Sequence, residues 1–316
     1  MKNNKLPVDF KKEPDKILQQ AEIDPDGFFD KIENQCDKEE LSGILSRFLN
    51  SSNNLKLLNK VIGEIASLKF ENNLDDLIDF LITEKFNKDT DANEVINLKI
   101  LCIKAISAYK NKKCIPVLLY CLNDKRANYK MRFQAAEALG KIGDKNAVES
   151  LINVVSDENE KSVYVRESAA VALGMIGDMR AIDPFLTILE AKKNFLDKFT
   201  FLKERVIEAI GKINFQSTER VISAFKNALD DYSPQVRINA IECLMNSDDK
   251  SAYDAIKNKL NDANEEVIRN AVIAMYNLKG KEALFEILKD ENISPAAKDE
   301  ADEIYREYEE ERAENG

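Results

Sequence analysis

The chain of 316 residues contains no histidine and no tryptophan. Without histidine, Ser-His and Cys-His nucleophilic catalysis and metal binding through imidazole are excluded. Glycine-rich phosphate cradles of the G-x-G-x-x-G or G-x-x-x-x-G-K-[ST] type are also missing. We therefore expect no catalytic residues, no metal site and no cofactor.

Helix breakers are scarce, with 10 Gly and 7 Pro in the whole chain, whereas average usage of the two together is about 12%. Hydrophobic residues make up 44% and charged residues 33%, which is enough apolar content for a core. Long apolar runs are absent, so no membrane-spanning helix is expected. The first residues, Met1 to Pro7, also lack the apolar stretch of a secretory signal.

Cysteine is used sparingly, and the five cysteines form no C-x-x-C pair: Cys36, Cys102, Cys114, Cys121 and Cys243. An odd number without that spacing indicates neither a disulfide framework nor a zinc site. Each lies among apolar neighbours, as buried free thiols do. Free thiols are typical of a reducing compartment, so we expect a cytoplasmic location.

Negative charge gathers at the C-terminal end. The formal net charge is −11, of which residues 299–316 contribute −7 and the other 298 residues only −4. Neither part carries the basic surface that nucleic-acid binding requires. The acidic tail is interpreted either as a solubilising end or as a binding site for a basic partner.

An internal repeat dominates the rest of the chain. Residues 131–144 read MRFQAAEALGKIGD, and residues 165–178 read VRESAAVALGMIGD, at an offset of 34. The position of Gly140 recurs in weaker copies, at spacings of 31 to 41 residues, at Ala66, Ser107, Gly174, Gly211, Met245 and Tyr276. Each copy is followed by a second apolar stretch with helical spacing, so each predicts a pair of helices.

The helix ends follow the same period. Asn128, Ser162, Ser233 and Asn264 are predicted to cap first helices. Gly143-Asp144 and Gly177-Asp178 are predicted to form the turn inside a pair, with glycine in the left-handed conformation. The small residues around Gly140 are expected to let a neighbouring helix pack closely.

Arginine and aspartate also recur together. Arg132 and Arg166 lie near the starts of two predicted first helices, and Asp144 and Asp178 lie in the turns that follow those helices. We expect a structural ladder in which each guanidinium bonds a turn aspartate of an adjacent repeat, since the guanidinium can bond two acceptors. The alternative is that the arginines hold an anionic ligand.

The pattern V-R-x-x-A-A-x-A-L-G-x-I-G-D, followed by A-[VI]-x-x-[LF]-[IL], resembles HEAT-like repeats of the type first described in phycobilin lyases. The match is most specific over residues 128–190 and extends from about 54 to 312. This resemblance implies an all-α, right-handed superhelix of about seven antiparallel helix pairs and a C-terminal capping helix. We divide the chain into an N-terminal extension (1–25), partly disordered or extended, a solenoid (26–293), and a capping helix with an acidic tail (294–316).

The resemblance also implies that the second helices line a concave side, the usual partner-binding surface of such folds. Outward positions on these helices are predicted to be Asp75, Asp79, Tyr120, Glu149, Asp183, Lys226 and Phe285. The first half of this row is acidic and includes an aromatic residue, which favours a basic or amphipathic peptide. The same alternation is equally typical of a solvated helix face.

Two functions remain open. The first is a noncatalytic scaffold that binds a protein or peptide, with neither nucleic acid nor membrane as a partner. The alternative is a phycobilin-lyase-like enzyme subunit, because the repeat type is found there. Deoxyhypusine hydroxylase, another enzyme of similar repeats, uses His-Glu motifs that a chain without histidine cannot form.

Overall fold

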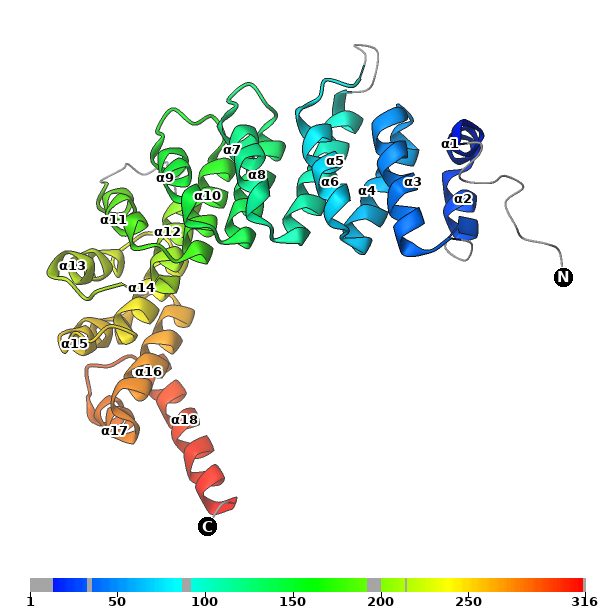
Figure 1. Ribbon diagram of the computed structural model, residues 1–316. Coiled ribbons are helices and arrows are strands. Elements are labelled where there is room, and N and C mark those ends of the chain that lie inside the picture. The colour runs from blue at the N-terminus through cyan, green and yellow to red at the C-terminus, as the bar shows by residue number, and fades with distance from the viewer. Residues whose placement is uncertain (1–13, 33–35, 87–91, 192–199, 214, 315–316) are drawn as a thin grey trace. The chain divides into compact units, whose positions relative to one another are not determined.

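The computed structural model describes residues 14–32, 36–86, 92–191, 200–213 and 215–314. Every regular element within these ranges is a helix, which confirms the expected all-α repeat fold. Seven consecutive helix pairs make up most of the described chain. Three helices precede them and a single long helix follows them (Figure 1).

The first helices of the pairs are α4 (Leu55–Leu68), α6 (Ala92–Tyr109), α8 (Tyr129–Ile142), α10 (Val163–Ile176), α12 (Thr200–Lys212), α14 (Pro234–Met245) and α16 (Glu265–Lys279). The second helices are α5 (Glu71–Ile82), α7 (Ile115–Asn123), α9 (Val148–Ser156), α11 (Ile182–Glu190), α13 (Glu219–Ala228), α15 (Ala252–Lys257) and α17 (Lys281–Lys289). The flanking helices are α1 (Pro14–Ile23), α2 (Pro25–Ile32), α3 (Lys38–Ser51) and α18 (Pro295–Glu314).

Part of the expected N-terminal extension is helical. Residues 14–23 form α1 instead of an extended segment. Ile17 and Ala21 are spaced four apart and both are buried, so this short helix gains its stability from packing. Residues 1–13 lie outside the described residues.

The chain divides into two compact units, residues 1–154 and 155–316. In the second unit the first helices lie beside one another, and the second helices form a separate layer (Figure 1). The core lies between these layers, where Leu173, Phe185, Phe225 and Ile241 are almost fully buried. Each pair exposes apolar surface at its sides, and the neighbouring pair covers it.

The predicted helix ends are mostly confirmed. Asn128 and Asn264 accept backbone N–H groups at the starts of α8 and α16, and Gly143 and Gly177 take the left-handed conformation with φ of 74° and 71°. Ser162 is the exception, because its side chain makes no capping bond and its hydroxyl is buried without a hydrogen-bond partner. The backbone N–H of Ser162 donates to the Glu160 carboxylate.

Small residues bring α10 and α12 together. A Cβ atom added to Gly174 would lie 2.9 Å from the Cα of Ala209, and the described structure therefore leaves no room for it. Gly174 occupies the same repeat position as Gly140, for which close approach of a neighbouring helix was predicted.

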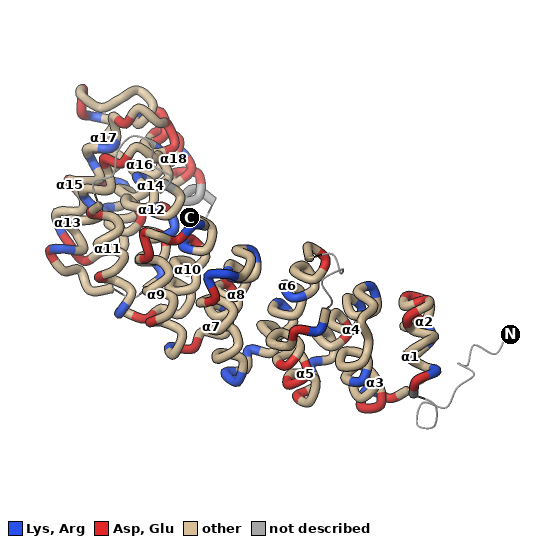
Figure 2. The backbone as a smooth tube through the Cα atoms, turned by 90° about the horizontal axis from the view of Figure 1, so that it is seen from above, with Lys and Arg blue, Asp and Glu red and all other residues tan. Residues whose placement is uncertain are grey.

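The C-terminal residues fold as α18. Ala297 and Ala301 are buried on one side of this helix, and Figure 2 shows acidic residues gathered along it. The insertion between α11 and α12 contains Phe195 and Phe199, whose predicted packing falls outside the described residues.

Candidate functional site

The row of predicted binding residues lies on second helices. Asp75 and Asp79 lie on α5, Tyr120 on α7, Glu149 on α9, Asp183 on α11, Lys226 on α13 and Phe285 on α17. All of these except the half-buried Lys226 are exposed. We call this row of seven residues the second-helix face, and we describe its two halves separately because they belong to different units.

Ion pairs join successive second helices along this face. Lys113, in the short 3-10 turn before α7, donates from Nζ to Asp75 on α5 at 2.8 Å. Arg220 on α13 pairs with Asp183 on α11 at 2.9 Å and also bonds Glu190 at 3.0 Å. Part of the predicted acidic charge is therefore paired with basic side chains of the neighbouring repeat. Exposed pairs of this kind each contribute little to stability.

The two predicted aromatic anchors differ in their surroundings. The side chain of Tyr120 is 59% exposed on α7. Phe285 is 38% exposed, and its ring centroid lies 5.2 Å from that of Tyr305 on α18. Phe285 therefore contributes mainly to the packing of the last helix, and Tyr120 is the stronger candidate for contact with a partner.

Arg132 and Arg166 each donate to a backbone carbonyl of the preceding second helix. Arg132 donates from Nε to the carbonyl oxygen of Leu122 at 2.9 Å, and Arg166 donates likewise to Val155 at 2.9 Å. Each acceptor lies in the last turn of the preceding second helix, where carbonyl groups lack partners within the helix. The positive charge is also favourable at that end of a helix dipole.

The turn aspartates act chiefly as caps. Asp144 accepts the N–H of Asn146 at 2.8 Å, and Lys112 of the preceding repeat lies 3.0 Å from its other oxygen. These two contacts hold the pKa of the Asp144 carboxyl below its usual value. Asp178 accepts from the backbone and the guanidinium of Arg180. Asp144 therefore makes a contact between repeats, with Lys112 as its basic partner.

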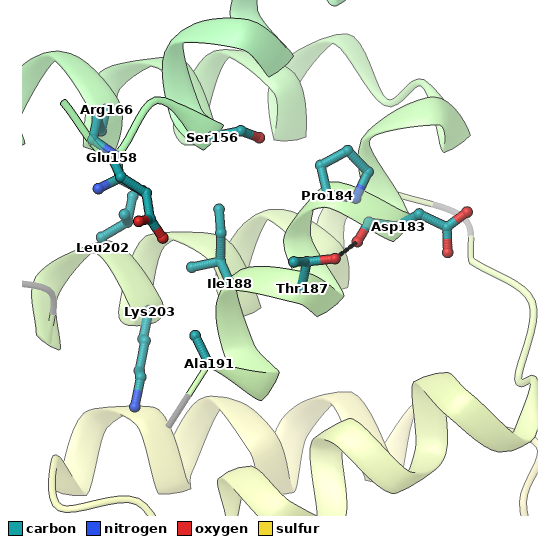
Figure 3. A pocket seen from close by; sticks show the side chains of 10 residues that line it. All are labelled: Ser156, Glu158, Arg166, Asp183, Pro184, Thr187, Ile188, Ala191, Leu202 and Lys203. Atoms are coloured by element: carbon teal, nitrogen blue, oxygen red, sulfur yellow. Dashed lines mark hydrogen bonds between the residues drawn. The ribbon is translucent and has the colours of Figure 1, made fainter. Parts of the chain in front are cut away.

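The second unit contains a cavity of about 420 Å³ that the sequence did not predict. It lies among the C-terminal end of α9, the turn after it, α10, α11 and the start of α12. Figure 3 shows the ten lining residues: Ser156, Glu158, Arg166, Asp183, Pro184, Thr187, Ile188, Ala191, Leu202 and Lys203. Asp183 belongs to the second-helix face, so the cavity adjoins that face.

Most polar groups around the cavity are engaged within the protein. Thr187 donates its hydroxyl to the backbone carbonyl of Asp183 at 3.0 Å (Figure 3). The ammonium of Lys203 lies 2.9 Å from Asp231, and both side chains are only 15% exposed. Burial lowers the pKa of the Arg166 guanidinium, and nearby Glu158 opposes that shift.

The sequence contained a signal for the ion pairs but none for the cavity. Asp75 and Lys113 are 38 residues apart, and Asp183 and Arg220 are 37 apart, so opposite charges recur about one repeat later. The cavity depends on how four helices, α9 to α12, are spaced. That spacing has no counterpart in a one-dimensional pattern.

Other kinds of site find no support in the described part of the chain. No group of three or more His, Cys, Asp or Glu side chains there is arranged to hold a metal ion. Among the same residues, no helix combines the length and apolar character needed to span a bilayer.

Comparison with known proteins identifies the repeat. The family model for HEAT repeats matches residues 81–163, 125–201, 196–277 and 222–298, which together cover more than half of the chain. No curated protein matches the chain.

Three solved structures are similar at low identity. Human deoxyhypusine hydroxylase in complex with glycerol is 17% identical, with a TM-score of 0.37, and the match covers 86% of this chain and 97% of that one. The complex of CpcE and CpcF of phycocyanin lyase from Nostoc sp. is 20% identical, with a TM-score of 0.43, covering 85% and 93%.

The third is an archaeal HEAT-like repeats protein from Thermococcus onnurineus, 16% identical with a TM-score of 0.43, covering 73% of this chain and 95% of that one. At these scores the likenesses assign no activity. The identification depends on the family model and on the observed helix pairs. On that basis the chain belongs to the family of HEAT-repeat proteins.

Proposed function

We propose that this chain is a noncatalytic scaffold that binds a partner protein or peptide on its second-helix face. The observation that carries the proposal is the exposure of Tyr120, 59% of whose side chain is accessible on α7. Exposed tyrosines that combine a large apolar surface with a hydroxyl group are frequent anchors in protein interfaces.

Charge supports a basic or amphipathic partner in the first unit. Asp75 and Asp79 are both exposed on α5, one turn apart. Although Lys113 pairs with Asp75, that carboxylate remains 56% exposed. A positively charged segment lying along α5 and α7 would meet these carboxylates beside Tyr120.

The test is affinity purification of the tagged full-length chain from its native cells, with quantitative mass spectrometry. Wild type is compared with Tyr120→Ser and with Tyr129→Ser. Tyr129 is an exposed tyrosine in the same unit that lies on first helix α8, so it controls for general loss of aromatic surface.

We expect a reproducible partner whose recovery falls at least fivefold with Tyr120→Ser and is unchanged with Tyr129→Ser. An equal loss of partner recovery with both variants would contradict binding at the second-helix face. Recovery of no reproducible partner by wild type would contradict the scaffold function itself.

A further inference from the structure

The cavity beside α11 has walls that are largely apolar. Pro184, Ile188 and Ala191 of the α11 region, together with Leu202 of α12, supply apolar surface. Ile188 and Ala191 are only partly covered by the rest of the protein. Because partly exposed apolar surface gains free energy when water leaves it, the walls favour an apolar occupant.

Most polar groups of the lining bond other groups of the protein, although the buried Nη1 of Arg166 makes no hydrogen bond. Thr187 bonds its own helix, Asp183 pairs with Arg220, and Lys203 pairs with Asp231. Arg166 donates to the Val155 carbonyl. An aliphatic side chain in the cavity would leave all of these contacts in place.

Two acidic side chains are exposed at the rim, one of them paired with the half-exposed Arg220. Glu158 and Asp183 are exposed, and the Asp183 side chain is 83% accessible. The two basic lining residues, Arg166 and Lys203, are buried or nearly so. Asp157 and Glu160 lie in the same turn as Glu158 and add to the negative potential there.

We propose that this cavity is the anchor site for a partner peptide in the second unit, taking an aliphatic side chain of that peptide into its apolar walls. A lysine or arginine next to that side chain in the peptide lies against Glu158 and Asp183. The inference rests on the proposed scaffold function and extends it, since Asp183 belongs to both the second-helix face and the cavity rim.

The size of the cavity suits this occupant. A volume of about 420 Å³ is at the lower end of the range of about 300 to 1,000 Å³ typical of ligand pockets. It accommodates one leucine, isoleucine or methionine side chain with part of its backbone. The walls hold that side chain, and the acidic rim selects the residues that flank it.

The probe is a library of random 12-residue peptides displayed on phage and selected against the full-length chain. Selected peptides are synthesised, and their binding is measured by fluorescence anisotropy. The test variant is Ile188→Lys, which places a charge in the cavity. The control is Asn227→Lys on α13, outside the cavity lining. Asn227 lies two residues after the buried Phe225, and Ile188 likewise lies two residues after the buried Leu186 on α11.

We expect the selected peptides to share an aliphatic residue flanked by Lys or Arg. Their affinity should fall at least tenfold in Ile188→Lys and change less than twofold in Asn227→Lys. Glu158→Lys should weaken the same peptides and improve binding of versions whose basic residues are replaced by glutamate. If Ile188→Lys fails to fold by circular dichroism, Ile188→Ser tests the wall without adding charge.

Several outcomes would overturn the inference. These are a selection that yields no binder, peptides with acidic flanks, or binders that are indifferent to Ile188→Lys. Self-association abolished by Ile188→Lys would assign the cavity to a second copy of the chain. Binding seen only after residues 192–199 are replaced by a Gly-Ser stretch would assign it to the chain's own insertion. A partner still captured through Tyr120 would show that the scaffold function survives such a failure.

Discussion

Gly174 on α10 faces the backbone of Ala209 on α12 so closely that a Cβ atom on the glycine would lie 2.9 Å from both the Cα and the Cβ of Ala209. Contacts this short do not occur between real Cβ atoms, so the two helices can adopt this spacing only with glycine at position 174. Two residues, one in each of two successive repeats, thus set how closely those repeats stack.

Replacing Gly174 with alanine should destabilise the second unit by about 1–3 kcal/mol, because overpacking outweighs the better helix propensity of alanine. Urea unfolding followed by circular dichroism measures the change. The control is Gly63→Ala in α4, where an added Cβ meets nothing within 4 Å. That change should stabilise by about 0.5–1 kcal/mol. Equal effects at both sites would contradict the packing argument.

Arg132→Met should cost about 2 kcal/mol of stability. The buried guanidinium donates to the Leu122 carbonyl at 2.9 Å, and methionine would leave that buried acceptor without this donor. The control is Arg126→Met, since Arg126 is 90% exposed and pairs with Asp124, which predicts a change below about 0.5 kcal/mol. The melting temperatures of both variants are measured by thermal unfolding. Similar decreases in the two variants would contradict the proposed contribution of the Arg132 hydrogen bond.

Glu286 should make stability depend on pH in the acid range. Its carboxylate accepts from Lys257 and from the Tyr253 hydroxyl, both at 2.7 Å, and these bonds lower its pKa below the ordinary 4.5. A lowered pKa in the folded state means that the stabilisation is present above about pH 4.5 and is lost as the pH falls through the folded-state value.

The melting temperatures of wild type and Glu286→Gln, measured between about pH 3 and pH 7, check this. The difference between the two proteins should be largest near neutral pH and should shrink below about pH 4.5. A difference that stays constant across this range would show that Glu286 acts through packing alone.

Thiol accessibility should divide the cysteines into two classes. Cys102, Cys114, Cys121 and Cys243 are buried, whereas Cys36 is partly exposed. Burial raises the pKa of Cys114 and Cys121 to about 11, so little reactive thiolate forms near neutral pH. With Ellman's reagent at about pH 8, Cys36 should react first and the other four only on unfolding. A fast-reacting thiol that persists in Cys36→Ser would contradict this assignment.

Sequence periodicity was sufficient for the helix pairs but not for their side-chain contacts. The recurrence of Gly143-Asp144 and Gly177-Asp178 located two turns correctly, because a left-handed glycine and a capping aspartate act within a few residues. Ser162 had the residue type of a cap, but its side chain makes no capping bond. Local patterns therefore predict where helices end more reliably than which group satisfies each end.

Sequence by itself determined the all-α repeat architecture and the helix pairs. Those features follow from the spacing of apolar residues within 10 to 40 positions, and this spacing is written along the chain. The tertiary structure decided the partners of Arg132 and Arg166, the ion pairs that use Asp75 and Asp183, and the cavity beside Ile188. These depend on distances between helices, which are set when side chains from separate repeats pack together in three dimensions.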